Sequence, residues 1–309
     1  LELIGPVSPT EEKVFRTRVG STIQQGLPCP SSATGDVDRQ WENGFSQICM
    51  ADVPCNWFQC QENSCDPVHF EWMHLNWGIR LKHADGGQPY SPRHLKVDFE
   101  EFEHGFVYRR LKEDMTEESE HWTIGRVALW PNGFFLGDHF EWRVPMDDEN
   151  TLSVAWMWQR VPLESEPYRQ KSIPAWRSNV RDPETGAWIT SHVMNQDFVA
   201  WVGQGVIADR SQEHLGASDR GIVMMRRRYF SELEAMARGE ALKGVLTPDL
   251  EGKPLSLPMA GRRLFTKGLS RDQMKQHPVL GRHLKAFPFQ HGQPDAVRQA
   301  YLEAMGVEI

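Results

Sequence analysis

The chain has 309 residues, of which 39% are apolar and 25% charged, an ordinary balance for a globular protein with a sizeable core. Its formal net charge of -8 opposes binding to nucleic acid or to an anionic membrane by bulk electrostatics. No run of 18 apolar residues occurs, so no transmembrane helix is expected. Five cysteines are too sparse for a disulfide framework, which favours a cytoplasmic location.

The chain is expected to divide into a lead-in and one large domain. Residues 1–45 are polar and rich in turn-forming residues, so we interpret them as a linker or a remnant of a preceding segment. The first residue is Leu rather than Met, which fits a sequence that begins partway through a reading frame, and the first ten residues lack signal-peptide features. Residues 46–309 are expected to form a single domain.

The order of elements predicts an α+β fold. Residues 53–75 contain few helix breakers and should be mainly helical from about Asn56, with an end or kink near Pro67. From about Leu95 to Trp158, short β-branched and aromatic runs alternate with turns, which predicts an antiparallel meander at 105–110, 122–130, 133–144 and 151–159. Helices are expected at 190–203, 222–239 and 294–306, and 244–275 is rich in loop-forming residues. The prediction is therefore a central antiparallel sheet flanked by helices.

The most informative local pattern is Asp-x2-His-x4-His, formed by Asp66, His69 and His74. Two neutral imidazoles and one carboxylate can occupy one face of an octahedral iron ion and leave three positions open. His69 and His74 are five residues apart, so they converge on one ion only if the helix ends or distorts between them. Pro67, two residues before His69, favours such a distortion.

The carboxylate ligand has to come from a distant segment. Asp197 lies near the start of a predicted helix and is a lone acid among large apolar residues. It should be buried, and a buried carboxylate needs a cation. The simpler alternatives are that Asp197 or Asn195 caps this helix, and that Asp66 initiates the turn before Pro67.

Two separated segments resemble the motifs of Rieske-type non-haem iron oxygenase α subunits. The first is similar to the mononuclear-iron motif and comprises Asn56-Trp57-Phe58-Gln59, Glu62-Asn63, Asp66, His69 and His74. The second is similar to the later motif of the phthalate-dioxygenase-like branch and comprises Gln196-Asp197 and the run from Gln204 to Asp219. The two motifs occur in the family's order, and the resemblance covers roughly residues 50–240.

The resemblance implies a helix-grip catalytic domain around a deep apolar pocket. It makes His69, His74 and Asp197 the ligands of a mononuclear Fe(II), and Asp66 the catalytic acid that links this site to the Rieske cluster of a neighbouring subunit. The implied reaction is O2-dependent hydroxylation, dihydroxylation or O-demethylation of a small aromatic compound. A homotrimer and an electron-transfer reductase or ferredoxin are the implied partners.

The chain departs from the family in one respect. A Rieske [2Fe-2S] cluster requires Cys-x-His followed by Cys-x2-His, and neither spacing occurs in these 309 residues. We therefore expect the cluster on a missing upstream domain or on a partner chain. The alternative from another functional class is a non-catalytic protein that keeps the pocket and binds an aromatic ligand.

Three other patterns have simpler interpretations. Cys55, Cys60 and Cys65 match no zinc spacing and are expected to be free thiols. His139-Phe140-Glu141 could contribute to a cupin-like iron site on a strand, but His-x-acid pairs occur about as often as composition predicts. Arg226-Arg227-Arg228 is expected to form a solvated helix face.

Overall fold

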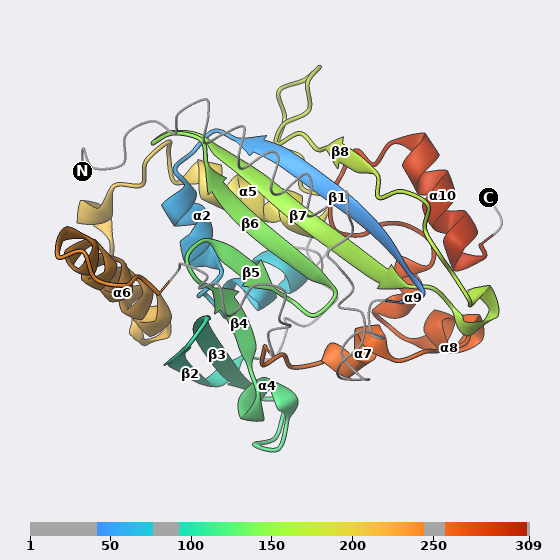
Figure 1. Cartoon of the computed structure of the whole chain (residues 1–309), viewed down its shortest axis with the longest axis horizontal. Coiled ribbons are helices and arrows are strands. Elements are labelled where there is room, and N and C mark those ends of the chain that lie inside the picture. The colour runs from blue at the N-terminus through green and yellow to red at the C-terminus, as the bar shows by residue number, and fades with distance from the viewer. Residues whose placement is uncertain (1–41, 77–92, 244–256, 308–309) are drawn as a thin grey trace.

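The computed structural model describes residues 42–76, 93–243 and 257–307, which are organised around one eight-stranded sheet. The spatial order is β2-β3-β4-β5-β6-β7-β1-β8, and every neighbouring pair is antiparallel except the parallel pair β1–β8 (Figure 1). The strands are Gly44–Val53 (β1), His94–Phe102 (β2), Gly105–Lys112 (β3), Arg126–Leu129 (β4), Gly133–Phe135 (β5), His139–Pro145 (β6), Thr151–Arg160 (β7) and Ala175–Arg177 (β8). The predicted antiparallel meander and the α+β class are confirmed.

Helices cover the sheet and its ends. They are Trp57–Asn63 (α2), the π-helix Phe70–Asn76 (η2), Glu120–Thr123 (α4), Val193–Gly203 (α5), Arg220–Ala237 (α6), Arg262–Thr266 (α7), Arg271–Gln276 (α8), Leu280–His283 (α9) and Asp295–Met305 (α10). Short 3-10 turns lie at Leu163–Ser165, Arg210–Gln212 and Ala217–Asp219. Figure 1 shows α2 and α5 together behind the long strands, with α6 beside β2 and β3 and with α7 to α10 at the opposite end. The helices therefore flank the sheet, as predicted.

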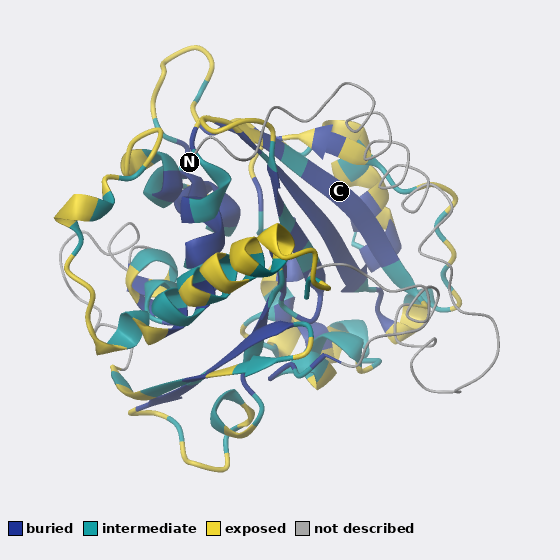
Figure 2. Cartoon of the chain, turned by 60° about the vertical axis from the view of Figure 1, so that its left-hand side comes forward, coloured by how far each residue is buried: buried dark blue, intermediate teal, exposed yellow. Residues whose placement is uncertain are grey.

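Strand β1, which lies between β7 and β8, is buried on both faces. On one face Cys49 and Ala51 pack with Phe198 and Trp201 of α5. On the other face Ile48 belongs to a cluster that also includes Val154, Trp156 and Trp158 of β7. Figure 2 shows the resulting dark-blue strands at the centre of the molecule. Because both faces are covered, β1 has no alternation of apolar and polar residues that a sequence pattern could reveal.

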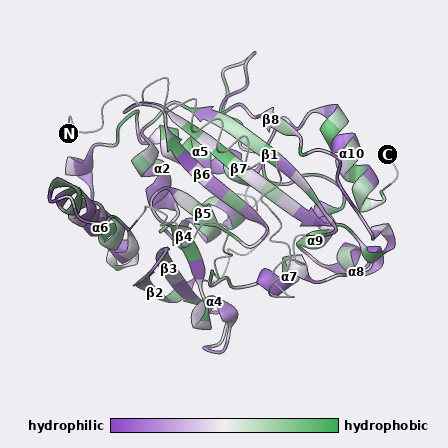
Figure 3. Ribbon diagram, viewed as in Figure 1, coloured by the Kyte–Doolittle hydropathy of each residue, from purple (hydrophilic) through white to green (hydrophobic). Residues whose placement is uncertain are grey.

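The helices carry mixed surfaces. Figure 3 shows hydrophilic and hydrophobic residues side by side along α6 and α10, as expected for helices that pack on one side only. α6 approaches β2 closely, because a Cβ added at Gly221 would lie 2.4 Å from ring carbons of Phe99. No helix of the described ranges combines the length and the apolar character that crossing a membrane requires.

Several predicted boundaries differ from the structure. β1 was not predicted, and its first two residues fall in the expected lead-in, of which residues 1–41 lie outside the described residues. The expected strand 122–130 begins with α4, and the expected strand 133–144 is divided into β5 and β6, with Gly137 between them at a φ of 88°. α7 and most of α8 lie in the segment predicted to be loop-rich. Predicted helices at 190–203, 222–239 and 294–306 agree with α5, α6 and α10 to within three residues.

Candidate metal centre

α2 and the turn after it deliver the two histidines. The Asn56 side chain caps α2 by accepting a hydrogen bond of 2.9 Å from the Phe58 backbone N–H. After the helix, the Asp66 carboxylate accepts a 2.8 Å hydrogen bond from the Val68 backbone N–H, so the turn-forming role considered for Asp66 is present. The π-helix η2 follows, and hydrogen bonds between residues i and i+5 bring side chains five positions apart to one side. The predicted distortion between His69 and His74 is confirmed.

Asp197 is the fifth residue of α5 and lies among core residues. α5 begins at Val193 with His192 at the N-cap position, so the capping alternatives for Asp197 and Asn195 are wrong. The predicted burial of Asp197 is confirmed, since only 5% of the residue is exposed. A helix that is packed against β1 therefore holds a carboxylate 128 positions after His69 in a rigid place.

The three side chains converge on one point. Nε2 of His69 lies 3.7 Å and Nε2 of His74 lies 3.3 Å from Oδ1 of Asp197. All three candidate ligand atoms lie within 4.8 Å of one another, and no other group of three or more His, Cys, Asp or Glu residues does so in the described part of the chain. The sequence-predicted trio is thus assembled by the fold, with all three side chains buried.

Each histidine uses its other ring nitrogen to hold its orientation. Nδ1 of His69 lies 2.6 Å from the backbone carbonyl oxygen of Asp66, and Nδ1 of His74 lies 2.9 Å from Oε1 of Gln196. Gln196 is itself fixed by a 2.9 Å hydrogen bond from its Nε2 to the Thr190 carbonyl oxygen. Because both acceptors require a proton on Nδ1, both Nε2 atoms present a lone pair towards Asp197.

Asp66 acts on His69 through its backbone. Its carboxylate Oδ2 lies 3.8 Å from Nδ1 of His69, which is beyond hydrogen-bond distance, whereas its carbonyl oxygen is at 2.6 Å. The Asp66 side chain is 30% exposed, unlike the buried histidine. Asn63, at the end of α2, directs its Nδ2 to Oδ1 of Asp197 at 3.4 Å.

For each of the two histidines, burial lowers the pKa and the negative charge of Asp197 raises it. Burial lowers the pKa of His69 and outweighs the attraction of Asp197 and Asp66. Burial also opposes protonation of His74, but the charge and hydrogen bonding of Asp197 raise its pKa overall. A metal ion needs both imidazoles in the neutral form, so its binding would compete with protonation of His74.

A cavity of about 290 Å³ opens beside the trio. Its apolar lining includes Phe70, Phe134, Leu136, Met194, Phe265 and Phe289. This volume is at the lower end of those typical for small-molecule sites, and it suits one compact aromatic molecule.

The polar wall of the cavity was not found from the sequence. It includes Arg110 and Arg126, which project from β3 and β4, and Arg143 of β6. Arg110 is only 6% exposed, but its strand also carries Arg109 and Lys112, so no signal in the sequence singled it out. Sequence alternation alone does not say which side of a strand faces a cavity.

The cupin-like alternative at His139 is contradicted. Nδ1 of His139 lies 2.8 Å from Asp138 and Nε2 lies 2.9 Å from Glu141, so neither nitrogen is left for a metal. Burial alone would lower the pKa of His139, but the two carboxylates raise it to about 9. Arg143 completes the network, with Nη2 at 2.6 Å from Glu141. This is a buried ion-pair network that lines the same cavity.

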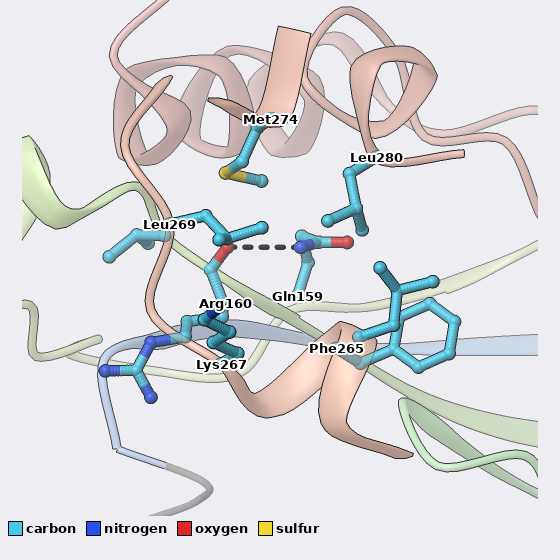
Figure 4. Close-up of a pocket in the computed structure, with 9 residues that line it drawn as sticks. Gln159, Arg160, Phe265, Lys267, Leu269, Met274 and Leu280 are labelled. Atoms are coloured by element: carbon cyan, nitrogen blue, oxygen red, sulfur yellow. Dashed lines mark hydrogen bonds between the residues drawn. The ribbon is translucent and has the colours of Figure 1, made fainter. Parts of the chain in front are cut away.

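A second cavity, at the end of β7, is far smaller. It measures about 10 Å³, room for roughly one water molecule, and it is lined by residues of β7 and of the α7 to α9 region (Figure 4). Gln159 points into this region and donates a 3.1 Å hydrogen bond to the Arg160 carbonyl oxygen. A space of this size holds no substrate.

The remaining sequence interpretations have mixed outcomes. Cys49, Cys55, Cys60 and Cys65 are free and buried, which confirms the thiol interpretation for the described cysteines. The interpretation of Arg226-Arg227-Arg228 as a solvated face is confirmed for the exposed Arg227. It is wrong for the other two, because Arg226 pairs with Glu62 and Glu213 at 2.7 Å, and Arg228 pairs with Glu101. Arg226 thereby ties α6 to α2 and to the loop that precedes α6.

Comparison with known proteins supports the resemblance. The family described as LigXa C-terminal domain like matches residues 177–256. The chain is 51% identical over 281 residues to the 5,5'-dehydrodivanillate O-demethylase oxygenase subunit of Sphingobium sp., which covers 91% of this chain and 65% of that protein. It is 25% identical to the phthalate 4,5-dioxygenase oxygenase subunit of Pseudomonas putida (64% and 53% covered) and 26% identical to the phenoxybenzoate dioxygenase subunit alpha of Ectopseudomonas oleovorans (63% and 46% covered). The chain thus spans between about half and two thirds of the length of these relatives.

Proposed function

We propose a function from one premise, that the chain belongs to the Rieske-type oxygenase α subunits of the phthalate-dioxygenase-like branch. The function is O2-dependent oxidation of a small aromatic compound, by hydroxylation, dihydroxylation or O-demethylation, at a mononuclear Fe(II). The observation that carries the proposal is the convergence of His69, His74 and Asp197, whose ligand atoms lie within 4.8 Å of one another.

The donor set fits divalent iron. Two neutral imidazoles and one carboxylate form the facial arrangement of non-haem iron oxygenases and leave open positions on the ion. Bound Fe(II) would supply the oxygen-activating chemistry. The chain's own contribution is to keep both Nε2 lone pairs aimed at Asp197 through the Asp66 carbonyl and Gln196. The apolar cavity beside the trio would hold the aromatic ring and exclude water from it.

The electrons would come from a Rieske [2Fe-2S] cluster outside these 309 residues, carried by a further domain or a partner chain and supplied by a reductase or ferredoxin. Asp66 would be the link, since its carboxylate is partly exposed while its carbonyl oxygen holds His69. A homotrimer in which each iron site meets a neighbour's cluster, and a cytoplasmic location, complete the proposal. O-demethylation is the reaction in the name of the Sphingobium relative, which makes it the first activity to test.

The decisive experiment is iron content after anaerobic reconstitution with Fe(II). We expect about one iron per chain in the wild type. His69→Ala and Asp197→Ala should lose it. His104→Ala is the matched control, because His104 is partly buried and pairs with Glu103 away from the cavity.

Circular dichroism should show that all variants are folded. Retention of iron in both ligand variants would reject the assignment. Folded wild-type protein that takes up no iron would reject it too, in favour of an aromatic-binding protein without catalysis.

A further inference from the structure

One wall of the large cavity carries two hydrogen-bond acceptors that the protein does not use. Asp138 and His283 both line the cavity, and they are only 3% and 5% exposed. Oδ1 of Asp138 is used by Nδ1 of His139 at 2.8 Å, but Oδ2 is buried and has no hydrogen-bond partner in the described part of the chain. A buried carboxylate oxygen without a donor is costly, so this atom marks a place for a donor group of a ligand.

His283, the last residue of α9, supplies the second acceptor. Its Nδ1 lies 2.7 Å from Oε1 of Gln159, whose Nε2 donates to the Arg160 carbonyl oxygen (Figure 4). Because that second bond turns the amide oxygen towards His283, Nδ1 is the donor. Burial lowers the pKa of His283 to about 4, so near pH 7 the ring is neutral and its Nε2 carries a lone pair. Nε2 has no hydrogen-bond partner among the residues that the structure describes.

An aromatic side chain lies between the two acceptors. The centre of the Phe289 ring is 5.1 Å from the centre of the His139 ring and 5.2 Å from that of the His283 ring. Asp138 is bonded to the first of these histidines, and its negative charge also acts on His283, where it raises the pKa against the larger effect of burial. Both acceptors therefore border one apolar ring, against which an aromatic ligand can pack.

Asp138 is separated from the metal trio by Glu141 and His139. Glu141 lies near the trio, because against the effect of burial the charges of Asp197 and Glu141 raise the pKa of His74. Glu141 contacts Nε2 of His139 and Asp138 contacts Nδ1, so the imidazole ring stands between the two carboxylates. The trio and the free oxygen of Asp138 thus border different parts of the same cavity. A ligand ring between them would present one substituent to each.

We propose that Asp138, assisted by His283, binds a hydroxyl group on the aromatic ring of the substrate, so that the cavity selects phenols over the corresponding ethers. The hydroxyl would donate to Oδ2 of Asp138, the charged and therefore stronger acceptor, with Nε2 of His283 as second acceptor of the same proton. An ether has no proton to donate and would leave both acceptors unpaired. The inference rests on the proposed function for the reaction at the metal trio, but the binding preference itself does not depend on a bound metal.

The test is calorimetric titration of the metal-free 309-residue protein with 4-methoxyphenol and with 1,4-dimethoxybenzene, which differ only in the hydroxyl proton and are both uncharged at about pH 7. Wild type should bind the phenol more tightly by about tenfold or more, as expected for a hydrogen bond to a charged group. Asp138→Asn keeps an oxygen for His139 but puts an NH2 donor in the place of Oδ2. It should reduce the preference to less than about twofold.

His283→Phe keeps an aromatic ring but removes the second acceptor, so it should retain only part of the preference. Asp272→Asn is the matched control, because it makes the same change on α8 at a side chain that is 84% exposed and outside the cavity lining. It should bind both probes as wild type does, and circular dichroism should show that the variants are folded.

Equal affinity of wild type for the two probes, as expected if water alone occupies these acceptors, would overturn the inference. No binding of the phenol, or a preference that survives undiminished in the folded variants of Asp138 and His283, would overturn it too. Because no metal is present in the titration, such a result leaves the iron assignment standing. Loss of the iron assignment would likewise leave the binding preference standing.

Discussion

Two clusters of histidine and carboxylate side chains line the same cavity. In one, called the closed cluster, both ring nitrogens of the histidine are occupied; in the other, called the open cluster, each histidine has one nitrogen left for a metal ion. In the cluster of Asp138, His139 and Glu141, both ring nitrogens of the histidine are used by carboxylates at 2.8 and 2.9 Å. In the cluster of His69, His74 and Asp197, Nδ1 of each histidine contacts a neutral oxygen atom. Both Nε2 atoms face the Asp197 carboxylate. The comparison teaches that residue composition does not make a metal site. A metal site requires lone pairs that the protein leaves unused and aims together.

The largest expected effect is on the free energy of unfolding, when a substitution disrupts the closed cluster of Asp138, His139 and Glu141. Glu141→Gln removes the carboxylate shared by His139 and Arg143, so that Asp138 alone still pairs with His139 and the buried Arg143 loses the carboxylate at 2.6 Å. We expect a loss of about 3–5 kcal/mol in the free energy of unfolding, measured by urea denaturation. Glu103→Gln, at a side chain that is 77% exposed, is the control and should change stability by less than about 0.5 kcal/mol. A similar small change in Glu141→Gln would show that the cluster contributes little to stability.

The closed cluster should also produce a pH dependence in the metal-free protein. The pKa of His139 is raised to about 9 in the folded state, so the folded protein binds this proton more tightly than the unfolded chain does. The resulting stability is fully present below the unfolded pKa of about 6.5 and is lost as the pH rises through about 9, by roughly 3 kcal/mol. Denaturation curves between these pH values test this. His139→Gln should flatten the profile, and an unchanged slope in that variant would assign the dependence to other groups.

A smaller effect, on iron affinity, is expected when a substitution removes a hydrogen bond that orients a ligand of the open cluster but leaves the three ligands in place. Gln196→Ala deletes the acceptor that holds Nδ1 of His74 and leaves His69, His74 and Asp197 in place. Loss of such a contact typically weakens metal affinity by about 10- to 100-fold, which anaerobic Fe(II) titration can measure. Gln204→Ala, at the exposed end of α5, is the matched control and should bind iron as wild type does. Equal affinity in both variants would mean that the protein backbone alone orients His74.

The smallest change in iron affinity is expected at Asp66. His69 is held by the backbone carbonyl of Asp66, and Asp66→Asn keeps both that carbonyl and a side-chain oxygen for the Val68 N–H. Iron affinity should therefore stay within about twofold of wild type. Turnover of an aromatic substrate in a system complete with a Rieske partner should nevertheless fall, if the Asp66 carboxylate is the link to the cluster. Unchanged turnover would remove Asp66 from that role.

The sequence predicted the parts of the fold that are local in the chain. The meander from β2 to β7 and the helices α5, α6 and α10 have short-range signals, namely turn residues between apolar runs and helical periodicity. β1 was missed because it is buried on both faces and pairs with β7, a strand that lies about a hundred residues later in the chain. The division into a lead-in up to residue 45 and a domain from residue 46 stays a prediction.

For the candidate site, too, some features could be predicted from the sequence and others depended on the tertiary structure. The spacing of Asp66, His69 and His74, the lone acid Asp197 and the absence of Rieske cysteine–histidine pairs are all present in the sequence by itself. Only the tertiary structure decided that η2 is a π-helix, that the carbonyl of Asp66 holds His69, and that Arg110, Arg126 and Arg143 line the cavity. The physical reason is that ligand identity and spacing are properties of the chain, whereas an unused lone pair or an unpaired charge depends on every neighbour that packing brings to it.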